Sequence, residues 1–568
     1  MRPKSSPDSA PATATGNQDF NTLIAALRAP GCYAHAVQGV EVLQTHISCI
    51  LLAGEYAYKI KKPLNLGFLD FSTLPARRHY CEEELRLNRR TAPELYLDVI
   101  PIGGSAQMPV LGSREPAIEY ALRMRRFPQD ALLERMARRG MLTPQHIDAL
   151  ASNLAAFHAR IERADAQSAF GSPEHILAQA LQNFDQLLSL TRHANHPNAG
   201  RRIPRRGGGR QVVQPSTGGA KAELALLERL RDWTAGRHAS LSAVFRARQR
   251  EGWVRECHGD LHLGNIALLA GVPTPFDGIE FSADLRWTDT MNEVAFLMMD
   301  LLDHRLPRLA FRFLNAYLEL TGDYAGMRVL RFYLVYRALV RAKVSCLRAH
   351  QAGISGRVKS DLAHEYRRYL LLAERIAASG HAAMLIMHGL SGSGKTSIAR
   401  GLQEALGAVC LRSDVERKRL HGLAAMARSA SGLGEGLYAP GASERTYAHL
   451  ANLAREVLAA RYPVIVDAAF LERAERDRFR RVARDAGAGF LIAACSAAEA
   501  TLRERIALRE RAASDASEAS LAVLERQLAT RETLAADETA YTLDIDAEHS
   551  AGHAEAAAVA ARLDLALT

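Results

Sequence analysis

The stretch Ala-Met-Leu-Ile-Met-His-Gly-Leu-Ser-Gly-Ser-Gly-Lys-Thr, residues 383–396, decides the fold of the C-terminal part of this chain. Residues 383–388 form an apolar run that predicts a buried strand, and residues 397–406 predict a helix. The glycine-rich segment between them fits the full pattern GxxxxGK[ST] in the strand–loop–helix context that this pattern requires. Backbone N–H groups of such a loop bind phosphate oxygens at the helix N-terminus. We therefore expect a nucleotide-binding loop, called the P-loop below, with these phosphate- and nucleotide-binding residues: Gly389, Leu390, Ser391, Gly392, Ser393, Gly394, Lys395, Thr396 and Ser397.

Side chains in and near the P-loop predict a metal site. Lys395 is expected to reach the β- and γ-phosphates of ATP, and Thr396 to offer its hydroxyl to Mg²⁺. Asp467 ends the apolar run 464–467, where a carboxylate orients metal-bound water; the competing interpretation is an aspartate that begins a loop. Apolar runs at 383–388, 464–467 and 489–494 alternate with helical segments, which predicts a parallel α/β sheet.

Downstream charged residues predict the acceptor side of this site. Asp414 follows a second strand candidate, the position of a substrate-facing carboxylate, and Arg417 is placed to bind an anionic substrate group. The alternative is a helix N-cap at Ser413 or Asp414 with solvated charges behind it. Arg505 and Arg509 share a helix face and are typical of a lid that closes over transferring phosphate, with 515–518 as its return; ordinary solvated helix charge is the competing interpretation.

A second chemical centre is indicated by His-Gly-Asp-Leu-His-Leu-Gly-Asn, residues 258–265, followed by Phe-Asp-Gly-Ile-Glu-Phe, residues 276–281. Asp260 and Asn265 have the five-residue offset of the catalytic base and a Mg²⁺ ligand in a phosphoryl-transfer loop. Asp277 stands where a second metal-binding aspartate would follow, on the next strand. This ordered set predicts phosphoryl transfer from ATP with Mg²⁺.

The rest of the chain predicts a small sheet followed by helices. Residues 46–54 and 55–62 are expected to form two strands joined by a tight turn, and 117–124 a third. Helices are expected at 21–28, 74–90, between 130 and 190, and at 221–233, 290–302, 307–320, 328–350 and 360–378. We expect a disordered tail (1–18), a first domain (19–378) with a flexible basic insertion at about 194–220, and a second domain (381–568).

Composition is that of an ordinary globular protein, with 48% hydrophobic and 24% charged residues. No apolar run is long enough to span a bilayer and the first residues are polar, so we expect a cytoplasmic protein without membrane partners. Seven scattered cysteines without CxxC spacing predict reduced thiols. The net charge of +10 is partly local to the insertion, and no aromatic residues interleave with it, so nucleic acid ranks below small phosphorylated ligands without being excluded. No pattern indicates an oligomeric state.

Residues 30–375 resemble the aminoglycoside phosphotransferase family, within the protein-kinase-like fold, through the motifs at 258–265 and 276–277. The resemblance implies a bilobal fold with Asp260 as catalytic base and Asn265 and Asp277 as Mg²⁺ ligands. It implies that Lys59 is the ATP-anchoring strand lysine, with Lys61 and Lys62 as competitors, and that Glu84 or a neighbour is its helix partner. The chain departs from protein kinases in having no G-x-G-x-x-G loop before Lys59.

Residues 381–545 are similar to the small P-loop kinases, such as gluconate and shikimate kinases and zeta-toxin-like proteins. Taken together, the motifs predict an enzyme with two ATP sites that transfers the γ-phosphoryl group of ATP to a hydroxyl of a small molecule. One alternative is a nucleotide-gated regulatory or binding protein with one degenerate site. The other is a nucleotide- or RNA-directed kinase.

Overall fold

The computed structural model describes residues 13–66, 69–194, 217–351, 354–425, 427, 441–512, 520–550 and 552–567. Most of the predicted tail and basic insertion, and the predicted lid return at 515–518, lie outside these ranges. The chain forms two compact units: unit 1 comprises residues 1–142, 157–163 and 255–288, and unit 2 comprises 143–156, 164–254 and 289–568. Each is described by itself below.

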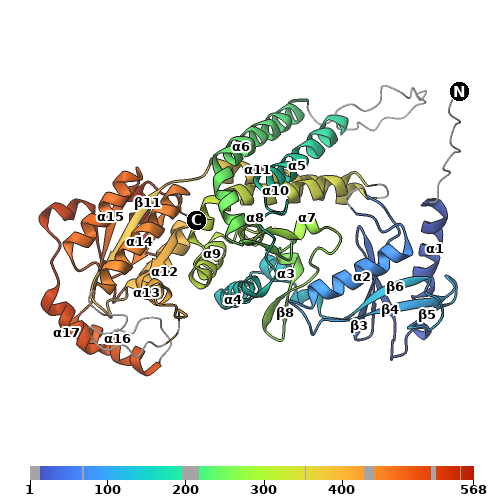
Figure 1. The fold of residues 1–568 in the computed structure, drawn as a ribbon, viewed down its shortest axis with the longest axis horizontal. Coiled ribbons are helices and arrows are strands. Elements are labelled where there is room, and N and C mark those ends of the chain that lie inside the picture. The colour runs from blue at the N-terminus through green and yellow to red at the C-terminus, as the bar shows by residue number, and fades with distance from the viewer. Residues whose placement is uncertain are drawn as a thin grey trace. The chain divides into compact units, whose positions relative to one another are not determined.

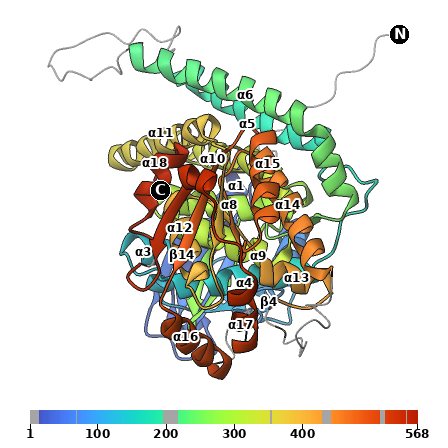
Figure 2. The ribbon, with the colours of Figure 1, turned by 90° about the vertical axis from the view of Figure 1, so that its left-hand side faces the viewer.

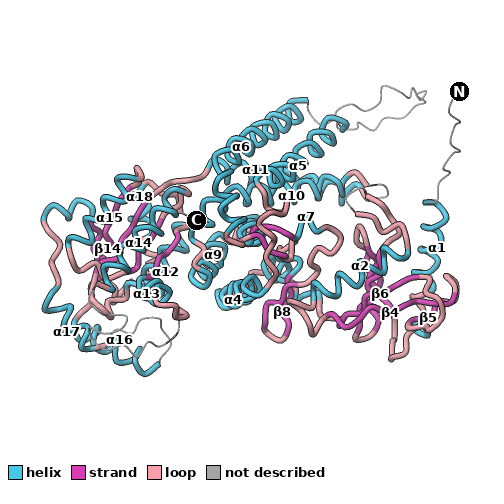
Figure 3. The backbone as a smooth tube through the Cα atoms, in the orientation of Figure 1, coloured by secondary structure: helices cyan, strands magenta, loops and turns pink. Residues whose placement is uncertain are grey.

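Unit 1 is built on an antiparallel sheet in the order β1-β2-β3-β6-β4-β5 (Figure 3). The strands are β1 (Val40–Gln44), β2 (Ser48–Ala53), β3 (Tyr56–Lys61), β4 (Tyr96–Gly104), β5 (Pro109–Leu111) and β6 (Glu119–Arg125). The two predicted strands joined by a tight turn are confirmed as β2 and β3, and the third as β6. Helix α2 (Leu74–Asn88) is also confirmed; it begins at the N-cap Thr73, whose hydroxyl accepts from the N–H of Ala76, and packs against β4 and β6.

Apolar side chains cover both faces of this sheet. On one face, Leu51 and Ile60 pack with Leu23 and Leu27 of helix α1 (Thr13–Ala26), which begins earlier than the helix predicted at 21–28. On the other face, the core includes Leu52, Ala57, Leu122 and Met124. The remaining elements wholly in unit 1 are η1 (Pro30–Cys32), η2 (Gln129–Ala131), α3 (Leu133–Arg138), η3 (Leu263–Asn265), β8 (Ile266–Leu269), β9 (Val272–Pro275) and α7 (Ala283–Arg286).

Three elements include residues of both units: α4 (Pro144–Arg160), β7 (Val254–Glu256) and β10 (Trp287–Asp289).

The first part of unit 2 is helical, as predicted (Figure 1). Its helices are α5 (Pro173–Ala194), α6 (Thr217–Arg250), α8 (Thr290–Asp303), α9 (Pro307–Thr321), η4 (Tyr324–Gly326), α10 (Met327–Ala349) and α11 (Gly356–Ala378). Helix α10 packs against α8 and α11, and α5 against α6. The guanidinium of Arg248 at the end of α6 is buried and donates to both Asp289, the N-cap of α8, and Asp323, so one cation fixes three helical elements.

The second part of unit 2 is a five-stranded parallel sheet in the order β12-β13-β11-β14-β15. Its strands are β11 (Ala383–His388), β12 (Val409–Arg412), β13 (Val464–Asp467), β14 (Gly489–Ser496) and β15 (Thr542–Asp546). The sheet lies between helices α12 (Lys395–Leu406) and α18 (Ala556–Leu563) on one side and α14 (Ala442–Ala459) and α15 (Arg473–Asp485) on the other (Figure 2). The other elements are α13 (Ser413–Leu420), α16 (Glu499–Ala512), α17 (Leu521–Thr530) and η6 (Ala536–Tyr541). The predicted parallel α/β fold is therefore confirmed.

Two further predictions bear on composition. All seven cysteines are free thiols, as expected. Among the described residues, none of the helices combines the length and apolar character needed to cross a membrane.

Candidate active sites

The P-loop connects the carboxyl end of β11 to the first turn of α12, where phosphate-binding N–H groups are expected. Gly389, Gly392 and Gly394 have φ values of 146°, 84° and 81°, which other residues rarely adopt. A Cβ atom on Gly392 would lie 2.7 Å from the carbonyl oxygen of Leu502, so this position also excludes a side chain by contact. The glycines therefore shape a tight backbone loop of the kind that binds phosphates.

The two predicted metal-ligand oxygens of the P-loop site are in contact. Thr396 Oγ1 donates a 2.7 Å hydrogen bond to Oδ2 of Asp467, which is 6% exposed at the end of β13. Burial raises the pKa of Asp467, and the positive charge of Arg412 counteracts that rise. Hydroxyl and carboxylate oxygens are the ligands that Mg²⁺ prefers, so this pair fits the expected cation.

The P-loop lysine lies beside the loop that it would serve. Lys395 Nζ donates a 2.7 Å hydrogen bond to the carbonyl oxygen of Leu390. Burial lowers the pKa of Lys395, and the charge of Asp467 partly offsets this effect. An incoming phosphate would supply the anionic partner that this partly buried ammonium group favours.

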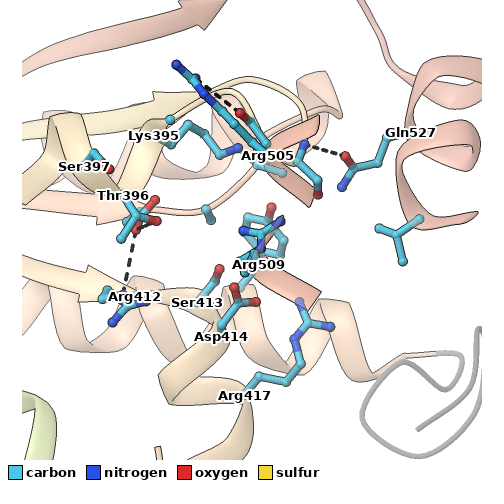
Figure 4. A pocket seen from close by; sticks show the side chains of 18 residues that line it. Lys395, Thr396, Ser397, Arg412, Ser413, Asp414, Arg417, Arg505, Arg509 and Gln527 are labelled. Carbon is cyan, nitrogen blue, oxygen red and sulfur yellow. Dashed lines mark hydrogen bonds and ion pairs between the residues drawn. The ribbon is translucent and has the colours of Figure 1, made fainter. Parts of the chain in front are cut away.

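The P-loop opens into a cavity of about 290 Å³ (Figure 4). Besides the P-loop, its lining includes the predicted residues Asp414 and Arg417 from α13 and Arg505 and Arg509 from α16. Arg505 is already engaged, since Nη2 donates a 2.9 Å hydrogen bond to the carbonyl oxygen of Ala547. Nε and Nη2 of Arg509 are buried and, within the described part of the chain, have no hydrogen-bond partner. The structure thus brings all four predicted side chains to one cavity.

The sequence analysis missed several lining residues of this cavity, of which two make polar contacts at the site. Arg412, at the end of β12, lies with Nε 3.9 Å from Oδ2 of Asp467. Gln527 of α17 accepts a 2.8 Å hydrogen bond from the N–H of Ser391 through Oε1, so α17 contacts the P-loop backbone. No spacing rule links a residue at the end of one strand to a carboxylate 55 residues away, or a glutamine to a loop 136 residues before it.

The second site lies in unit 1, where β3 and α2 hold the predicted lysine and glutamate together. Lys59 Nζ donates a 2.7 Å hydrogen bond to Oε1 of Glu84 and also contacts Oδ1 of Asp277. Burial alone would lower the pKa of Lys59, but the carboxylates of Asp277 and Glu84 raise it well above its ordinary value. Lys59 is therefore a charged group at this site, in contact with both helix α2 and the loop that carries Asp277.

Lys61, a predicted competitor for the partner of Glu84, also makes a buried contact with Glu280 that the sequence analysis did not anticipate. Its Nζ donates a 2.7 Å hydrogen bond to Oε2 of Glu84 and contacts Oε1 of Glu280. The Lys61, Glu84 and Glu280 side chains are at most 4% exposed. Lys62 instead donates to the backbone carbonyl of Thr45. Of the competing lysines, Lys59 and Lys61 both reach Glu84, and Lys59 alone is seen to contact Asp277.

The predicted base and metal ligands in unit 1 follow one another in short loops. Asn265 Nδ2 donates a 2.9 Å hydrogen bond to Oδ2 of Asp260, whose side chain is 36% exposed. Asp277 was predicted to lie on a strand, but it follows the end of β9 in a loop and has φ = 63°. The left-handed conformation interrupts the extended backbone and turns the chain at the predicted metal ligand Asp277.

Several contacts hold the Asp277 loop. The N–H of Asp277 donates a 2.9 Å hydrogen bond to Oη of Tyr96, and the N–H of Gly278 donates a 2.8 Å hydrogen bond to Oδ1 of Asn88. The ring of His258 contacts the carbonyl oxygen of Phe276 at 2.8 Å. These partners come from β4, α2 and the loop that carries Asp260. The same elements therefore support Asp277 and the loop of Asp260 and Asn265.

Unit 1 also has a cavity of about 410 Å³ near the turn between β2 and β3. It is lined by Glu41, Leu52, Gly54, Glu55, Arg126, Phe127, Pro128 and Gln129. Phe127 packs edge-on against Phe276, with ring centroids 5.3 Å apart, next to Asp277. The cavity has the size and partly apolar lining of a small-molecule site.

Comparisons with known proteins identify relatives over most of the chain. Over 504 residues, 87% of this chain and 92% of the relative, the sequence is 31% identical to the uncharacterized protein Rv2004c of Mycobacterium tuberculosis. The match to the uncharacterized protein Mb2027c of Mycobacterium bovis has the same identity and coverage. Residues 384–534 match the family AAA_33, described as an AAA domain.

Solved structures resemble each part of the chain. A gluconokinase from Sinorhizobium meliloti has 23% identity and a TM-score of 0.24, covering 33% of this chain and 95% of its own. The amicoumacin kinase hAmiN has 13% identity and a TM-score of 0.35, covering 63% of this chain and 94% of its own. A Plasmodium vivax ethanolamine kinase has 11% identity and a TM-score of 0.34, covering 58% of this chain and 81% of its own.

Proposed function

We propose that this chain, which belongs to the same family as the mycobacterial protein Rv2004c, is an ATP-dependent phosphotransferase that acts on a hydroxyl of a small molecule. The observation that carries this proposal is the set of groups around one cavity in unit 2. There, Lys395, the Thr396–Asp467 pair and Asp414 line the same space beside the P-loop. A phosphate-binding loop, two metal-ligand oxygens and an acceptor-facing carboxylate are the parts that phosphoryl transfer requires.

Each side chain has a role in this reaction. P-loop N–H groups and Lys395 would bind the ATP phosphates, while Thr396 and Asp467 would hold Mg²⁺. When bound, Mg²⁺ neutralises charge on the β- and γ-phosphates. Asp414 would orient the acceptor hydroxyl and accept its proton, as the hydroxyl oxygen attacks the γ-phosphorus, the bond from the γ-phosphorus to the β-phosphate oxygen breaks and ADP leaves.

The arginines extend the proposal to the acceptor. Arg417 lies on α13 one turn after Asp414, and Arg509 faces the same cavity with two buried nitrogens that have no hydrogen-bond partner in the described residues. Buried guanidinium groups favour anionic partners. We therefore include an anionic group on the acceptor, beside the hydroxyl, in the proposed substrate.

The proposal assigns a second ATP site to unit 1. Asp260 would accept the proton of an acceptor hydroxyl, Asn265 and Asp277 would hold Mg²⁺, and Lys59, positioned by Glu84, would bind ATP phosphate. The 410 Å³ cavity beside Phe127 offers space for the adenine base of this ATP.

A second candidate function is that unit 1 binds nucleotide and regulates the chain without transferring phosphate. The contact between Lys59 and Asp277 favours it, because a metal ligand already paired with an ammonium group must exchange partners to bind Mg²⁺. A nucleotide- or RNA-directed kinase ranks third, because no aromatic residues interleave with the basic insertion. We further propose a cytoplasmic location and domain boundaries near 18/19 and 378/381.

The test combines labelled ATP with variants of each site. The full-length chain is incubated with [γ-³²P]ATP, Mg²⁺ and pools of small hydroxylated acids, and labelled products are separated. We expect label transfer to a small molecule. If unit 2 performs the transfer, labelling is lost in Lys395→Met and kept in Asp260→Asn. Wild-type labelling by the double variant Asp260→Asn, Lys395→Met would show that neither site transfers phosphate. Loss in Asp260→Asn alone would assign transfer to unit 1.

A further inference from the structure

Helix α9, which precedes the residues that match AAA_33, covers the edge strand β12 of the parallel sheet in unit 2. Asn315 Nδ2 donates a 2.9 Å hydrogen bond to the carbonyl oxygen of Ala408, and Asn315 Oδ1 accepts a 2.7 Å hydrogen bond from the N–H of Cys410. The side-chain amide thus pairs with edge strand β12 as a peptide group of a neighbouring strand would. Asn315 is only 6% exposed, so these hydrogen bonds replace water that the strand would otherwise need.

One turn later, α9 reaches the proposed metal site through an arginine. Glu319 Oε1 accepts a 2.9 Å hydrogen bond from Nη1 of Arg412, and Nε of the same guanidinium lies 3.9 Å from Oδ2 of Asp467. That carboxylate oxygen is the one that accepts the hydrogen bond from Thr396. Figure 4 shows Arg412 and Thr396 on the same side of the cavity. A continuous series of contacts therefore joins α9 to the metal-ligand pair.

A helix–sheet salt bridge of purely structural value would not need this geometry. The Arg412 side chain is 13% exposed and its planar guanidinium contacts two carboxylates from different elements, which restricts its orientation. A second arginine fixes the next segment, because Arg419 of α13 donates to the backbone carbonyl of Glu319 and contacts the carboxylate of Glu416. Helix α13 carries Asp414, so α9 supports both the metal side and the acceptor side of the cavity.

We infer that Arg412 is a positioning residue for the proposed phosphotransferase site, oriented by Glu319 and in turn orienting Asp467 toward Mg²⁺. Helix α9 therefore contributes to metal binding at the P-loop site, although it lies outside the residues that match AAA_33. The inference rests on the proposed function of that site. It concerns only contacts within unit 2.

Glu319→Ala is the decisive variant, because the Glu319 side chain is 31% exposed and does not line the cavity, and its ion pair with Arg412 links it to the metal-ligand pair. ATP binding to the full-length chain is measured by calorimetry over a Mg²⁺ series, and the part lost in Lys395→Met is assigned to the P-loop site. We expect Glu319→Ala to weaken the Mg²⁺-dependent component about tenfold, as for other residues that orient metal ligands. Binding without Mg²⁺ should stay as in the wild type.

Three further variants separate positioning from general loosening of α9. Glu319→Gln keeps an acceptor oxygen and should stay within about twofold of the wild type. In Glu319→Ala, Arg412→Ala, the two effects should not add, because both changes remove one interaction. Arg312→Gln is the matched control on α9: Arg312 pairs with Asp148 and Glu404 away from Arg412, and its loss should leave the Mg²⁺ dependence unchanged.

Two outcomes would overturn the inference: wild-type Mg²⁺ dependence in Glu319→Ala, or an equal loss in Arg312→Gln. Thermal unfolding of every variant confirms that the chain is folded. Binding is measured without turnover, so a wild-type chain that binds Mg²⁺ and ATP but labels no acceptor contradicts the proposed function, while the comparison of Glu319→Ala with Arg312→Gln still decides the role of Arg412.

Discussion

Thr396 Oγ1 lies 2.7 Å from Oδ2 of Asp467, although the two residues are 71 positions apart and belong to α12 and β13. The parallel order of β11 and β13 causes this meeting, because the carboxyl ends of both strands lie at one edge of the sheet. The hydroxyl follows the P-loop at that edge and the carboxylate ends the neighbouring strand. The sheet topology thus assembles a two-oxygen site that neither segment contains alone.

Thr396→Val should remove one of the two oxygens while keeping the side-chain shape. We expect Mg²⁺-dependent ATP binding at the P-loop site to weaken about tenfold or more, as for the loss of a group that ligates or orients a metal. Thr396→Ser restores a hydroxyl and should bind nearly as the wild type. Calorimetry over a Mg²⁺ series distinguishes the two, and equal binding by Thr396→Val and the wild type would contradict the assignment of Thr396 to the metal site.

Lys395→Met should weaken ATP binding at the same site even without Mg²⁺. A hydrogen bond to a charged group contributes about 1.5–3 kcal/mol, which corresponds to an affinity loss of about 10- to 100-fold. Measuring Lys395→Met in the Lys59→Met background, which removes the proposed ATP-binding lysine of unit 1, separates this site from unit 1. Lys395→Arg is the control that keeps the charge on a larger group. Unchanged affinity in Lys395→Met would show that the P-loop does not bind the nucleotide.

Lys61→Met should destabilise unit 1, because it breaks a buried ion pair as well as removing a buried side chain. The substitution leaves Glu280 without its lysine in a buried setting, where breaking an ion pair costs about 3–5 kcal/mol. Adding Glu280→Gln removes the orphaned charge and should recover part of this loss. Chemical denaturation measures both effects. If the double variant is as unstable as the single one, the Lys61–Glu280 contact is not the source of the destabilisation.

The sequence patterns located the elements whose own residues show a clear period. The strand-forming runs at 46–62, the apolar runs before the P-loop and at 464–467, and the long helices between 290 and 378 all identified real elements. The strands that were missed include β1, β4 and β5 of unit 1 and β15 of unit 2. Strand β4 contains Pro101 and ends in two glycines, which argue against a strand when only propensity is considered. Its pairing with β6, not its own composition, makes it a strand.

The site was predictable where chemistry requires a fixed spacing and not where the fold brings distant residues together. The P-loop and the Asp260–Asn265 pair are local motifs, and Lys59 was found because its neighbours resemble a known strand. Lys61 and Glu280 are 219 residues apart, and Arg412 and Glu319 are 93 apart. Such pairs depend on tertiary packing, and a single sequence contains no rule that selects them from the other charged residues.

Glu475 on α15 should make stability depend on pH in the neutral range. Burial, followed by the nearby acids Glu444 and Glu472 and opposed by Arg478, raises its pKa from 4.5 to about 7. Because the folded state holds the proton more tightly than the unfolded state, this stabilisation is complete below pH 4.5 and is lost as the pH rises through about 7.

Glu475→Gln should therefore stabilise the protein at pH 8 relative to the wild type, by on the order of 1 kcal/mol after allowance for solvent screening, and the gain should shrink toward pH 5. Urea unfolding at several pH values measures the difference. Asp485→Asn, at an exposed position at the end of α15 and not among the groups that shift Glu475, is the matched control and should show no such trend. A constant gain at every pH would assign the effect to packing and not to the charge of Glu475.

The amide of Asn315 has a consequence for how the two parts of this polypeptide can be inherited. A chain cut near residue 381 would lose the groups that satisfy Ala408 and Cys410, leaving an open strand edge of the kind that recruits other strands. A gene encoding the C-terminal part alone would thus specify a protein prone to aggregation unless β12 first acquired another cover. If the two parts were separated during evolution, the C-terminal part would lose solubility before it lost catalytic activity.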